Sequence, residues 1–489
     1  MESSTSERAP RRGDVLELSV DRLARRGGAL GEVEGRGVRL LHAVPGSRVR
    51  AEVRRRRRGR VEAHVVEVVD PGPHSREQRC PHFVSCGGCS WQDVAYEQQL
   101  VELARMLEEE LAPLRAALGE ELVIAPVLGC AEPWAYRNKM DFTFGAKRWV
   151  EPHEAEDAGN RDFALGLHSP GRFDKVLDVE QCAIQFARGD AIKNSARRLA
   201  KERELEPWDA RAHTGVLRHL VLREGRASGE LLALLVCADR ELEAVRAYAL
   251  ELVRLHPELT TLVLGVRSAV SAVAVGERYE VLHGPGHIHE ELGGVRYEVS
   301  PTSFFQTNTA QAEQLVRLVR EALSDVSGTL YDLYCGTGTF ALSLAAQFER
   351  VHGFELSQEA VEDARRNAAN NGIEHVDFEA GDLLLTLAPE ALAERGLARP
   401  DACVVDPPRA GVQPKALSAL RALAPPRLVY VSCNPKTAAE DLALLAQDGY
   451  RVLSVQPVDL FPHTPHLECV FHLVGPGAPT RVAAAAPTE

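Results

Sequence analysis

The first 70 residues alternate between apolar and polar positions in short stretches. Four of them show the β-branched or alternating pattern of half-buried strands, at residues 15–18, 38–41, 49–53 and 61–69. Glycines and the pair Pro45-Gly46 separate them, as expected of tight turns. Several short strands in so short a segment predict a small β-barrel over residues 12–70, with Asp70-Pro71-Gly72-Pro73 as the linker that leaves it.

The periodicity then changes to that of a helix. Leucines recur at steps of three and four, at positions 100, 103, 107, 111, 114 and 118. This stripe predicts a packing face on a helix over residues 93–118, which could contact the C-terminal domain. The segment 123–299 mixes patterns, and its strand-like pieces at 229–236 and 262–266 do not define a topology. We expect a central α+β domain over residues 71–295.

From residue 296 to 474, strand patterns and helix patterns alternate. The predicted strands cover residues 330–334, 350–355, 402–405 and 427–431, and the predicted helices cover residues 340–348 and 357–370. Such alternation is typical of a doubly wound, Rossmann-like α/β domain with a parallel sheet. The last segment, 475–489, is rich in Pro and Ala and is expected to be disordered. The whole chain is therefore predicted to be a multidomain α/β protein.

The bulk composition agrees with several folded domains. A length of 489 residues suggests about three domains, and a hydrophobic fraction of 45% is ordinary for a globular protein with a real core. No run of about 18 apolar residues is present, so no membrane span is expected. The segment from Met1 to Arg12 has no apolar stretch of the kind that a secretory signal needs. These features predict a cytoplasmic protein.

Charge is distributed unevenly along the chain. The formal net charge of −13 by itself argues against a nucleic-acid partner. Between Arg8 and Arg60, however, 16 Arg stand against 6 acidic residues, with a peak at Arg54–Arg58. A basic barrel of the OB-like, nucleic-acid-binding kind could anchor phosphates. The alternative is that the arginine run is a solvated, disordered segment.

A glycine-rich turn, Gly336-Thr337-Gly338, stands between a predicted strand and a predicted helix. Glycines there let the backbone approach a ligand closely, and the helix N-terminus offers free N–H groups. Glu355 ends the next strand, where a carboxylate can accept hydrogen bonds from ribose hydroxyls. Asp382 would flank an adenine. The turn therefore predicts a cofactor that contains a nucleoside.

The glycine turn alone does not choose between cofactors. The run from Gly336 to Ala341 also fits the dinucleotide pattern G-x-G-x-x-A, so an NAD-dependent oxidoreductase is a rival. The turn Asp406-Pro407-Pro408 follows a later strand, and such rigid turns are typical of nucleic-acid methyltransferases. Enzymes that methylate exocyclic amines generally carry an aromatic residue where Arg409 stands, so that reaction is disfavoured. The alternative for this segment is an ordinary tight turn.

Cys433 lies in Ser432-Cys433-Asn434-Pro435, directly after a predicted strand. A turn at the carboxyl end of a strand would expose its thiol, and a thiolate can add to C6 of uracil, which makes C5 nucleophilic. The C5 proton must then leave to a general base, for which Glu468 is the candidate. These residues favour an S-adenosylmethionine enzyme that methylates a pyrimidine carbon. The alternatives are an inert buried thiol and a solvent-facing Glu.

Three of the ten cysteines form a cluster, Cys80-x5-Cys86-x2-Cys89, on a glycine-rich loop. A closed four-thiolate site requires a fourth ligand, and the candidates are Cys130, Cys182 and Cys237. The spacing does not distinguish an iron–sulfur cluster from zinc. It differs from C-x3-C-x2-C, the pattern of radical S-adenosylmethionine enzymes. A disulfide framework is not expected in a cytoplasmic chain.

These motifs resemble the RNA uracil-C5 methyltransferase family, and within it the 23S ribosomal RNA branch. The resemblance spans residues 12–474 and rests on segments 301–308, 332–340, 406–411, 432–435 and 461–468. It implies that S-adenosylmethionine is the donor, that Cys433 is the nucleophile and that Glu468 is the base. The implied donor site consists of Gln306, Tyr334, Gly336, Gly338, Thr339, Glu355, Asp382 and Asp406. Tyr334 and Thr339 stand where the family often has Phe and Asn.

The same resemblance assigns the other parts of the chain. The N-terminal barrel looks like a TRAM domain, which is an RNA-binding module, and segment 296–474 would be the methyltransferase domain. The cysteine cluster would hold a [4Fe–4S] cluster with Cys182 as the fourth ligand. The expected partner is RNA, in the first place 23S ribosomal RNA, with no membrane and no obligatory protein partner evident. A transfer RNA methyltransferase would use the same catalytic residues, and a non-enzymatic iron–sulfur RNA-binding protein would need neither Glu468 nor the glycine turn.

Overall fold

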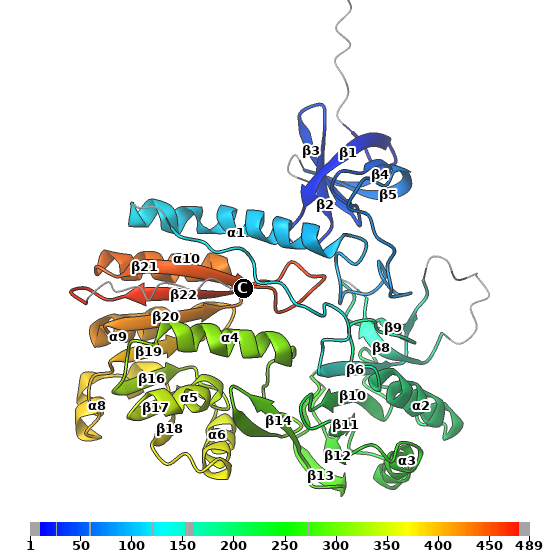
Figure 1. Cartoon of the computed structure of the whole chain (residues 1–489). Coiled ribbons are helices and arrows are strands. Elements are labelled where there is room, and N and C mark those ends of the chain that lie inside the picture. The colour runs from blue at the N-terminus through cyan, green and yellow to red at the C-terminus, as the bar shows by residue number, and fades with distance from the viewer. Residues whose placement is uncertain are drawn as a thin grey trace, which may run out of the picture. The chain divides into compact units, whose positions relative to one another are not determined.

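The computed structural model describes residues 10–25, 27–57, 60–119, 122–151, 154, 161–169, 171–270 and 273–478. The chain divides into two compact units, whose elements are labelled in Figure 1. The first unit comprises residues 1–106 and 461–465, and the second comprises residues 107–460 and 466–489. Arg58 and residues 479–489 of the predicted tail lie outside the described residues.

The first unit contains a closed five-stranded β-barrel (Figure 1). Its strands are β1 (Val15–Leu23), β2 (Ala29–Val33), β3 (Arg36–Leu41), β4 (Arg48–Arg57) and β5 (Arg60–Asp70), in the spatial order β1-β2-β3-β5-β4. β1 pairs with β4 and closes the barrel. Alternate residues are buried along the strands, among them Val38, Leu40, Val49, Ala51 and Val53. The predicted N-terminal barrel is confirmed, and β2 is a strand that its glycine-rich surroundings concealed.

The arginine run is part of this barrel. Arg54 to Arg57 lie in the hairpin of β4 and β5, so the alternative of a disordered segment is wrong for these residues. Arg55 pairs with Glu62 at 2.8 Å, and Nε of Arg54 donates to Nδ1 of His64 at 2.8 Å. The side chains of Glu62 and His64 on β5 therefore hold the arginine run in an extended conformation.

A long helix follows the barrel and the cysteine loop. α1 (Tyr96–Leu118) begins three residues later than predicted and ends where predicted. Four leucines of the stripe are buried, as a packing face requires: Leu103, Leu107, Leu111 and Leu114. Within the first unit, Oε2 of Glu102 accepts a hydrogen bond from the backbone N–H of Leu23 at 3.0 Å.

Segment 461–465 belongs to the first unit although it comes near the end of the chain. The carbonyl of His463 accepts hydrogen bonds from the backbone N–H groups of Ser90 at 2.8 Å and Trp91 at 3.2 Å. Oε1 of Gln99 accepts from the His463 N–H at 3.1 Å. These contacts hold the segment against the end of the cysteine loop and the start of α1.

The second unit contains an eight-stranded, mostly antiparallel sheet with the spatial order β13-β12-β11-β10-β6-β8-β9-β7. Its strands are β6 (Lys139–Gly145), β7 (Arg148–Trp149), β8 (Ala164–His168), β9 (Val176–Asp178), β10 (Leu217–Glu224), β11 (Leu231–Cys237), β12 (Thr261–Val266) and β13 (Arg278–His283). Two helices, α2 (Gly189–Glu202) and α3 (Leu242–Leu255), pack on this sheet (Figure 1). Ile192 and Tyr248 of these helices share one core with Phe142 and Leu220 of the strands.

The second unit also contains a seven-stranded sheet with the spatial order β18-β17-β16-β19-β20-β22-β21. Its strands are β16 (Thr329–Leu333), β17 (Arg350–Glu355), β18 (Val376–Ala380), β19 (Ala402–Val405), β20 (Arg427–Ser432), β21 (Arg451–Val458) and β22 (Glu468–Val474). The helices around it are α4 (Thr309–Ala322), α5 (Thr339–Leu344), α6 (Gln358–Asn370), α7 (Leu383–Thr386), α8 (Pro389–Glu394), α9 (Pro414–Leu423) and α10 (Pro435–Gln447). A hairpin of β14 (Ile288–Leu292) and β15 (Val295–Val299) precedes them.

The strand order of the seven-stranded sheet determines where a ligand can lie. β18, β17, β16, β19 and β20 run parallel, whereas β22 is antiparallel to both of its neighbours. From β16 the chain passes outward through β17 and β18 and then returns to β19 on the other side of β16. The carboxyl ends of β16 and β19 therefore flank a topological switch point, where open α/β sheets form a ligand crevice.

Local caps fix several helix ends. Asn308 caps α4 by accepting from the Gln311 N–H, and Ser357 caps α6 by accepting from the Ala360 N–H. The predicted helix 340–348 is shorter than expected, because α5 ends at Leu344 and a 3₁₀ turn follows over Ala345–Gln347. Among the described residues, no helix is both long enough and apolar enough to cross a membrane.

Candidate active site

The glycine turn lies between β16 and α5, at the switch point of the sheet. Tyr334, Gly336 and Gly338 have positive φ angles of 63°, 55° and 85°. A Cβ atom on Gly336 would meet nothing within 4 Å, whereas one on Gly338 would lie 2.8 Å from the Phe378 ring. Gly338 is therefore required by packing, and Gly336 leaves one face of the backbone open to a ligand.

Asp332 anchors this turn from inside the sheet. Its side chain is fully buried, and Oδ2 accepts a hydrogen bond from the Ala341 N–H of α5 at 2.8 Å. Burial raises the pKa of this carboxyl to about 8. Asp332 belongs to the glycine-rich motif, but the sequence alone assigned it no role. The feature of the sequence that could have identified Asp332 is that it is the one charged residue in the predicted strand 330–334.

A cavity of about 440 Å³ opens beside the turn. Its lining includes five of the predicted cofactor residues, namely Gln306, Tyr334, Gly336, Thr339 and Asp406. Apolar side chains complete it, among them Phe304, Leu315, Val316 and Phe340. A cavity with a few polar groups on an apolar wall is the usual form of a site for a small cofactor.

Glu355 and Asp382 follow neighbouring parallel strands and do not line that cavity. Oε2 of Glu355 accepts from the Gly336 N–H at 3.1 Å, and Oε1 accepts from the Ser357 N–H at 3.0 Å. The glycine turn and the end of β17 are thereby joined. Asp382 is exposed and caps α7 through the Leu384 N–H at 2.9 Å. Both carboxylates lie at the carboxyl ends of their strands, as the sequence predicted.

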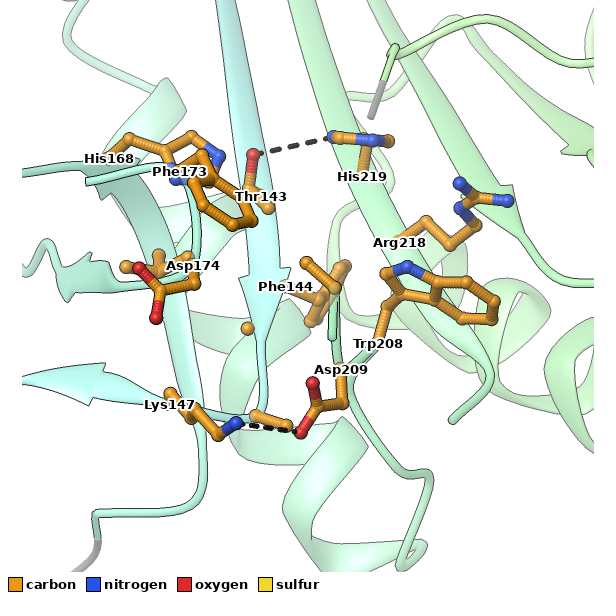
Figure 2. Close-up of a pocket in the computed structure, with 14 residues that line it drawn as sticks. Thr143, Phe144, Lys147, His168, Phe173, Asp174, Trp208, Asp209, Arg218 and His219 are labelled. Atoms are coloured by element: carbon orange, nitrogen blue, oxygen red, sulfur yellow. Dashed lines mark hydrogen bonds and ion pairs between the residues drawn. The ribbon is translucent and has the colours of Figure 1, made fainter. Parts of the chain in front are cut away.

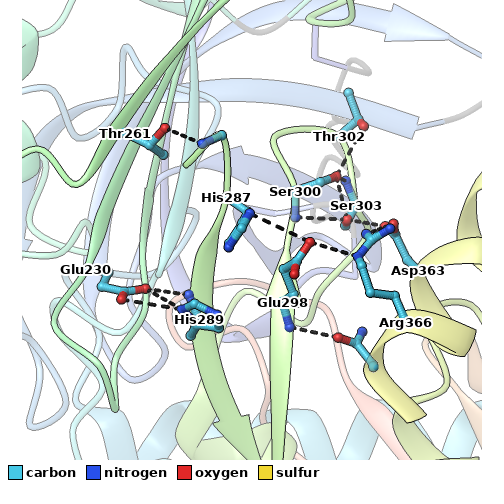
Figure 3. Close-up of polar contacts among 12 residues, drawn as sticks. Glu230, Thr261, His287, His289, Glu298, Ser300, Thr302, Ser303, Asp363 and Arg366 are labelled. Carbon is cyan, nitrogen blue, oxygen red and sulfur yellow. Dashed lines mark hydrogen bonds and ion pairs between the residues drawn. The ribbon is translucent and has the colours of Figure 1, made fainter. Parts of the chain in front are cut away.

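The loop from Ser300 to Asn308 brings Gln306 to the cavity. Figure 3 shows Ser300 and Ser303 grouped with Asp363 and Arg366 of α6, and Ser303 Oγ donates to Asp363. Nδ2 of Asn138 donates to the carbonyl of Gln306 at 2.9 Å. The loop is therefore tied both to α6 and to the segment before β6, and sequence reasoning did not identify these ties.

Cys433 and Glu468 lie at the same end of the β20–β22 pair. Cys433 follows the last residue of β20, and Glu468 is the first residue of β22. Ser432 pairs with Cys469 in the register of these strands, so the next pair outward is Cys433 and Glu468. Directly opposite residues in such a ladder have Cβ atoms about 5 Å apart. Residues that are distant in sequence thus become neighbours.

The thiol and two carboxyls share a poorly solvated environment. Burial, with the nearby Glu468 and Asp406, raises the pKa of the half-buried Cys433 thiol to about 11. Burial raises the pKa of Glu468, which is 5% exposed, to about 8, and Asp406 adds to this. Burial also raises the pKa of Asp406 to about 7. Arg409 opposes these shifts at Cys433 and Glu468. Perturbed groups in one place mark a site of proton chemistry.

The turn after β19 is held against the turn after β20. Nδ2 of Asn434 donates to the Arg409 carbonyl at 2.9 Å. Oδ2 of Asp441 accepts from the Val412 N–H at 2.8 Å and from the Tyr430 hydroxyl at 2.6 Å. Asp406 and Cys433 are therefore carried by two connected turns. Asp441 was not foreseen, because it lies within α10, outside every motif.

The cysteine cluster gives a different result. Cys80 is buried, Cys86 and Cys89 are half-buried on a loop of the first unit, and Cys182 lies in the second unit. The Gly88 N–H donates to Sγ of Cys86 at 3.3 Å. In the part of the chain that the structure describes, no three His, Cys, Asp or Glu side chains form a group that could hold a metal ion. The assignment of an iron–sulfur cluster to these cysteines therefore stays a prediction.

Comparisons with known proteins agree with the geometry of the seven-stranded sheet. Residues 287–475 match the family model described as tRNA (Uracil-5-)-methyltransferase. A Porphyromonas gingivalis protein described as "Uncharacterized RNA methyltransferase" is 37% identical over 94% of this chain and 99% of its own length. A Chlorobaculum tepidum protein, also described as an RNA methyltransferase, is 38% identical over 94% of this chain and 96% of its own length.

A solved structure extends the likeness to the whole fold. The Pyrococcus abyssi tRNA (uracil-54, C5)-methyltransferase, in complex with S-adenosyl-L-homocysteine, superposes with a TM-score of 0.71 at 27% identity. The match covers 94% of this chain and 100% of that one. The chain therefore belongs to the RNA uracil-C5 methyltransferase family. The resemblance seen in the motifs is confirmed at this level, and the NAD-dependent oxidoreductase alternative is wrong.

Proposed function

We propose that this chain transfers a methyl group from S-adenosylmethionine to C5 of a uridine in RNA, through a transient bond between Cys433 and C6. The observation that carries the proposal is that Cys433 lies near both Glu468 and Asp406, whose charges raise its pKa, because Asp406 also lines the cavity next to the glycine turn. A nucleophile, a base and a donor site are thus contiguous at one edge of the sheet.

The donor site is supported by the neighbouring structure and by the cavity. The Pyrococcus abyssi enzyme holds S-adenosyl-L-homocysteine, and the cavity contains Gln306, Tyr334, Thr339 and Asp406. We assign Glu355 to the ribose hydroxyls and Asp382 to the adenine, with Gly336 and Gly338 shaping the turn. Asp406, which lines the cavity, would face the methionine part. S-adenosylmethionine supplies an electrophilic methyl group when it is bound there.

The first step is an addition. The Cys433 thiolate bonds to C6 of the uracil, the C5–C6 double bond opens, and its electron pair becomes available at C5. With a thiol pKa of about 11 the thiolate is scarce at neutral pH, and Arg409 is the cation whose charge lowers that pKa. The uridine must leave the base stack to reach Cys433, so we expect a flipped or single-stranded target.

The second step substitutes C5 and restores the ring. The C5–methyl bond forms as the methyl–sulfur bond of the donor breaks, which leaves S-adenosylhomocysteine. The C5 proton passes to the Glu468 carboxylate, the electrons of that C–H bond re-form the C5–C6 double bond, and the C6–sulfur bond breaks. A pKa of about 8 makes Glu468 a stronger base than an ordinary Glu, which suits the removal of a carbon-bound proton.

We propose 23S ribosomal RNA as the target, with transfer RNA as the alternative. The motif resemblance favours 23S ribosomal RNA. A transfer RNA is favoured by the Pyrococcus abyssi neighbour, whose described target is uracil 54 of tRNA. Mass mapping of 5-methyluridine in both RNA classes, from cells with and without the gene, decides between them. The expected result is the loss of the modification from 23S ribosomal RNA, and identical maps from the two strains would overturn the proposed function.

We assign RNA anchoring to the N-terminal barrel, as a TRAM-like module. Arg54, Arg55 and Arg56 stand exposed on β4, where they can meet phosphates. Replacing all three with Gln should weaken RNA binding and flatten its salt dependence, by roughly one unit of log–log slope for each phosphate that is no longer neutralised. An unchanged slope would remove the barrel as the anchor. Replacement of Glu17, Asp21 and Glu32 with Gln is the matched control.

We infer that Cys80, Cys86 and Cys89 bind a [4Fe–4S] cluster, with Cys182 as the predicted fourth ligand. Thiolates are the ligands that such clusters require, and the Gly88 N–H near Sγ of Cys86 is the kind of hydrogen bond that stabilises a bound thiolate. Protein purified without oxygen should contain iron and sulfide in equal amounts. Cys182→Ser should lose both, whereas Cys130→Ser and Cys237→Ser should keep them. Zinc without sulfide would overturn this inference.

A further inference from the structure

A second cavity, partly open to solvent, lies in the eight-stranded sheet, and none of the residues assigned above lines it. Phe144 of β6 and Arg218 and His219 of β10 contribute to its walls, as do the segments that precede β9 and β10. Figure 2 shows Phe173 and His168 on one side of it and Trp208 with Arg218 on the other. No motif pointed to this place.

Aromatic side chains give the cavity surfaces for a planar ligand. Phe173 is 68% exposed, although a large apolar side chain gains stability when it is covered. Trp208 is 9% exposed, and the guanidinium of Arg218 stacks on it with 4.4 Å between its central carbon and the ring centre. The exposed ring is therefore that of Phe173, with the Arg211 guanidinium 5.7 Å from its centre. Unstacked bases of single-stranded RNA pack on exposed aromatic rings and on guanidinium planes.

Charged side chains of both signs line the cavity, and further cations lie beside it. Lys147 pairs with Asp209 at 3.4 Å, and Arg211 and Arg172 both pair with Asp174, at 2.7 and 3.6 Å. Two further cations lie at Trp208, which are Arg218 and Arg240. The lining itself holds two cations, Lys147 and Arg218, and two carboxylates, and Arg172, Arg211 and Arg240 contact lining residues from beside it. Cations beside a hollow can attract the phosphate of a ligand.

Neutral polar groups complete the lining. Thr143 Oγ1 lies 3.4 Å from Nδ1 of His219, and Figure 2 draws this contact. Burial, followed by the charge of Arg218, lowers the pKa of His219 to about 4, so the ring is neutral. Nδ1 of His168 is buried and has no hydrogen-bond partner among the described residues. Such groups can read the edge of a base.

We propose that this cavity receives an unstacked nucleotide of the substrate RNA, distinct from the uridine that is methylated. Its base stacks on Phe173, and its phosphate meets Lys147 and Arg211. The proposal rests on the proposed function only in that the substrate is RNA. It does not depend on the chemistry at Cys433. The cavity would add affinity and restrict which RNA loops are accepted.

The test measures RNA affinity separately from catalysis. Full-length Cys433→Ala protein is titrated with ribosomal RNA and transfer RNA from cells that lack the gene. Adding Phe173→Ala should weaken binding of the substrate RNA by about five- to 150-fold, the range for losing one base–aromatic stack. Adding Lys147→Ala should weaken binding less and lower the salt slope by about one. Tyr279→Ala and Lys415→Ala, which change exposed residues elsewhere in the second unit, should bind like their parent.

A second measurement keeps the test decisive if a variant is poorly folded. RNA that contains 4-thiouridine is crosslinked to the wild-type chain, and the attached peptides are identified by mass spectrometry. Attachment within residues 161–187 or 203–219 supports the cavity as a nucleotide site. The proposal is overturned if both cavity variants bind RNA like the controls, or if no attachment falls in these segments. A wild-type chain that binds RNA there without methylating it would overturn the proposed function alone.

Discussion

The two sheets of the second unit organise their chemistry in different ways. The seven-stranded sheet has five parallel strands, so the turns after β16, β17, β19 and β20 all lie at one edge. The eight-stranded sheet is mostly antiparallel, and its cavity combines strand faces with two loop segments. Parallel topology therefore brings together residues that each follow a strand, and this can be read from the sequence. The cavity of the eight-stranded sheet cannot be predicted from the sequence in this way.

The electrostatics of the two places differ as well. At the edge of the seven-stranded sheet, Asp332, Asp406 and Glu468 all have raised pKa values. Groups that titrate near neutral pH suit proton transfer. Around the cavity of the eight-stranded sheet, Lys147 and Arg218 stand beside Asp174 and Asp209, and the Phe173 ring is exposed. That combination suits binding. Under the two proposals, the second unit binds a nucleotide of the RNA at its eight-stranded sheet and methylates the uridine at its seven-stranded sheet.

The largest effect is expected from Cys433→Ala. Methyl transfer should fall by a factor on the order of 10⁴ or more, because the nucleophile is lost. Binding of S-adenosylhomocysteine should stay within about twofold, since the donor cavity does not include Cys433. Cys403→Ala is the control, because Cys403 is buried within β19 of the same sheet. Equal turnover in the two variants would contradict the role of Cys433.

Glu468→Gln should have the next largest effect. Turnover should drop by roughly 10²- to 10⁴-fold, the range for loss of a general base. A covalent complex between protein and RNA should accumulate, because addition and methylation can occur but the C5 proton cannot leave. Denaturing gels report it as a band that nuclease removes. Glu440→Gln on the exposed face of α10 should behave like the wild type. A variant without any adduct would count against Glu468.

The pH dependence of kcat/KM should reflect the titration of Cys433 and Glu468. The reactive forms are the thiolate and the carboxylate, both deprotonated, and the pKa values are about 11 for Cys433 and about 8 for Glu468. The value of kcat/KM should therefore rise with pH, by about tenfold per unit for each group that is still protonated. In Glu468→Gln the inflection near pH 8 should disappear. A rate that falls between pH 6 and 8 would reverse the assigned protonation states.

The last prediction concerns stability rather than turnover. The pKa of Asp332 is about 8 in the fold, against about 3.9 for an unfolded chain. The fold favours the neutral carboxyl, so stability falls as pH rises from about 4 to about 8, by up to about 1.4 kcal/mol per unit. Asp332→Asn should lack this loss, which urea midpoints at pH 5 and pH 8 can measure. Asp377→Asn, at an exposed position, should keep it. Equal pH dependence in all three proteins would exclude a buried neutral Asp332.

Local patterns in the sequence predicted much of the fold. The barrel, the leucine stripe of α1 and the alternating strands and helices are short-range patterns, and each helix or strand predicted in the C-terminal domain has a counterpart in the structure. Gly336, Asp406 and Cys433 could be placed because each follows a strand closely. β2 was not predicted, because the glycines within it and beside it are typical of turns.

Other features depend on contacts between distant residues. The pairing of Cys433 with Glu468 depends on the register of β20 and β22. The tie from Asn138 to Gln306 joins residues 168 apart in sequence. The inclusion of segment 461–465 in the first unit is equally non-local. No local pattern encodes such contacts, and the cavity lined by Phe173 and Trp208 arises in the same way.

The proposed bond between sulfur and the ring is tested most directly with RNA in which 5-fluorouridine replaces uridine. Fluorine at C5 cannot leave as a proton, so the wild-type chain should stop after methylation with the RNA still attached. Mass spectrometry of the digested complex should find a methylated fluorouridine on the peptide that contains Cys433. Attachment at another residue, or methylation of ordinary RNA by a chain that forms no adduct with the fluorinated one, would contradict the mechanism.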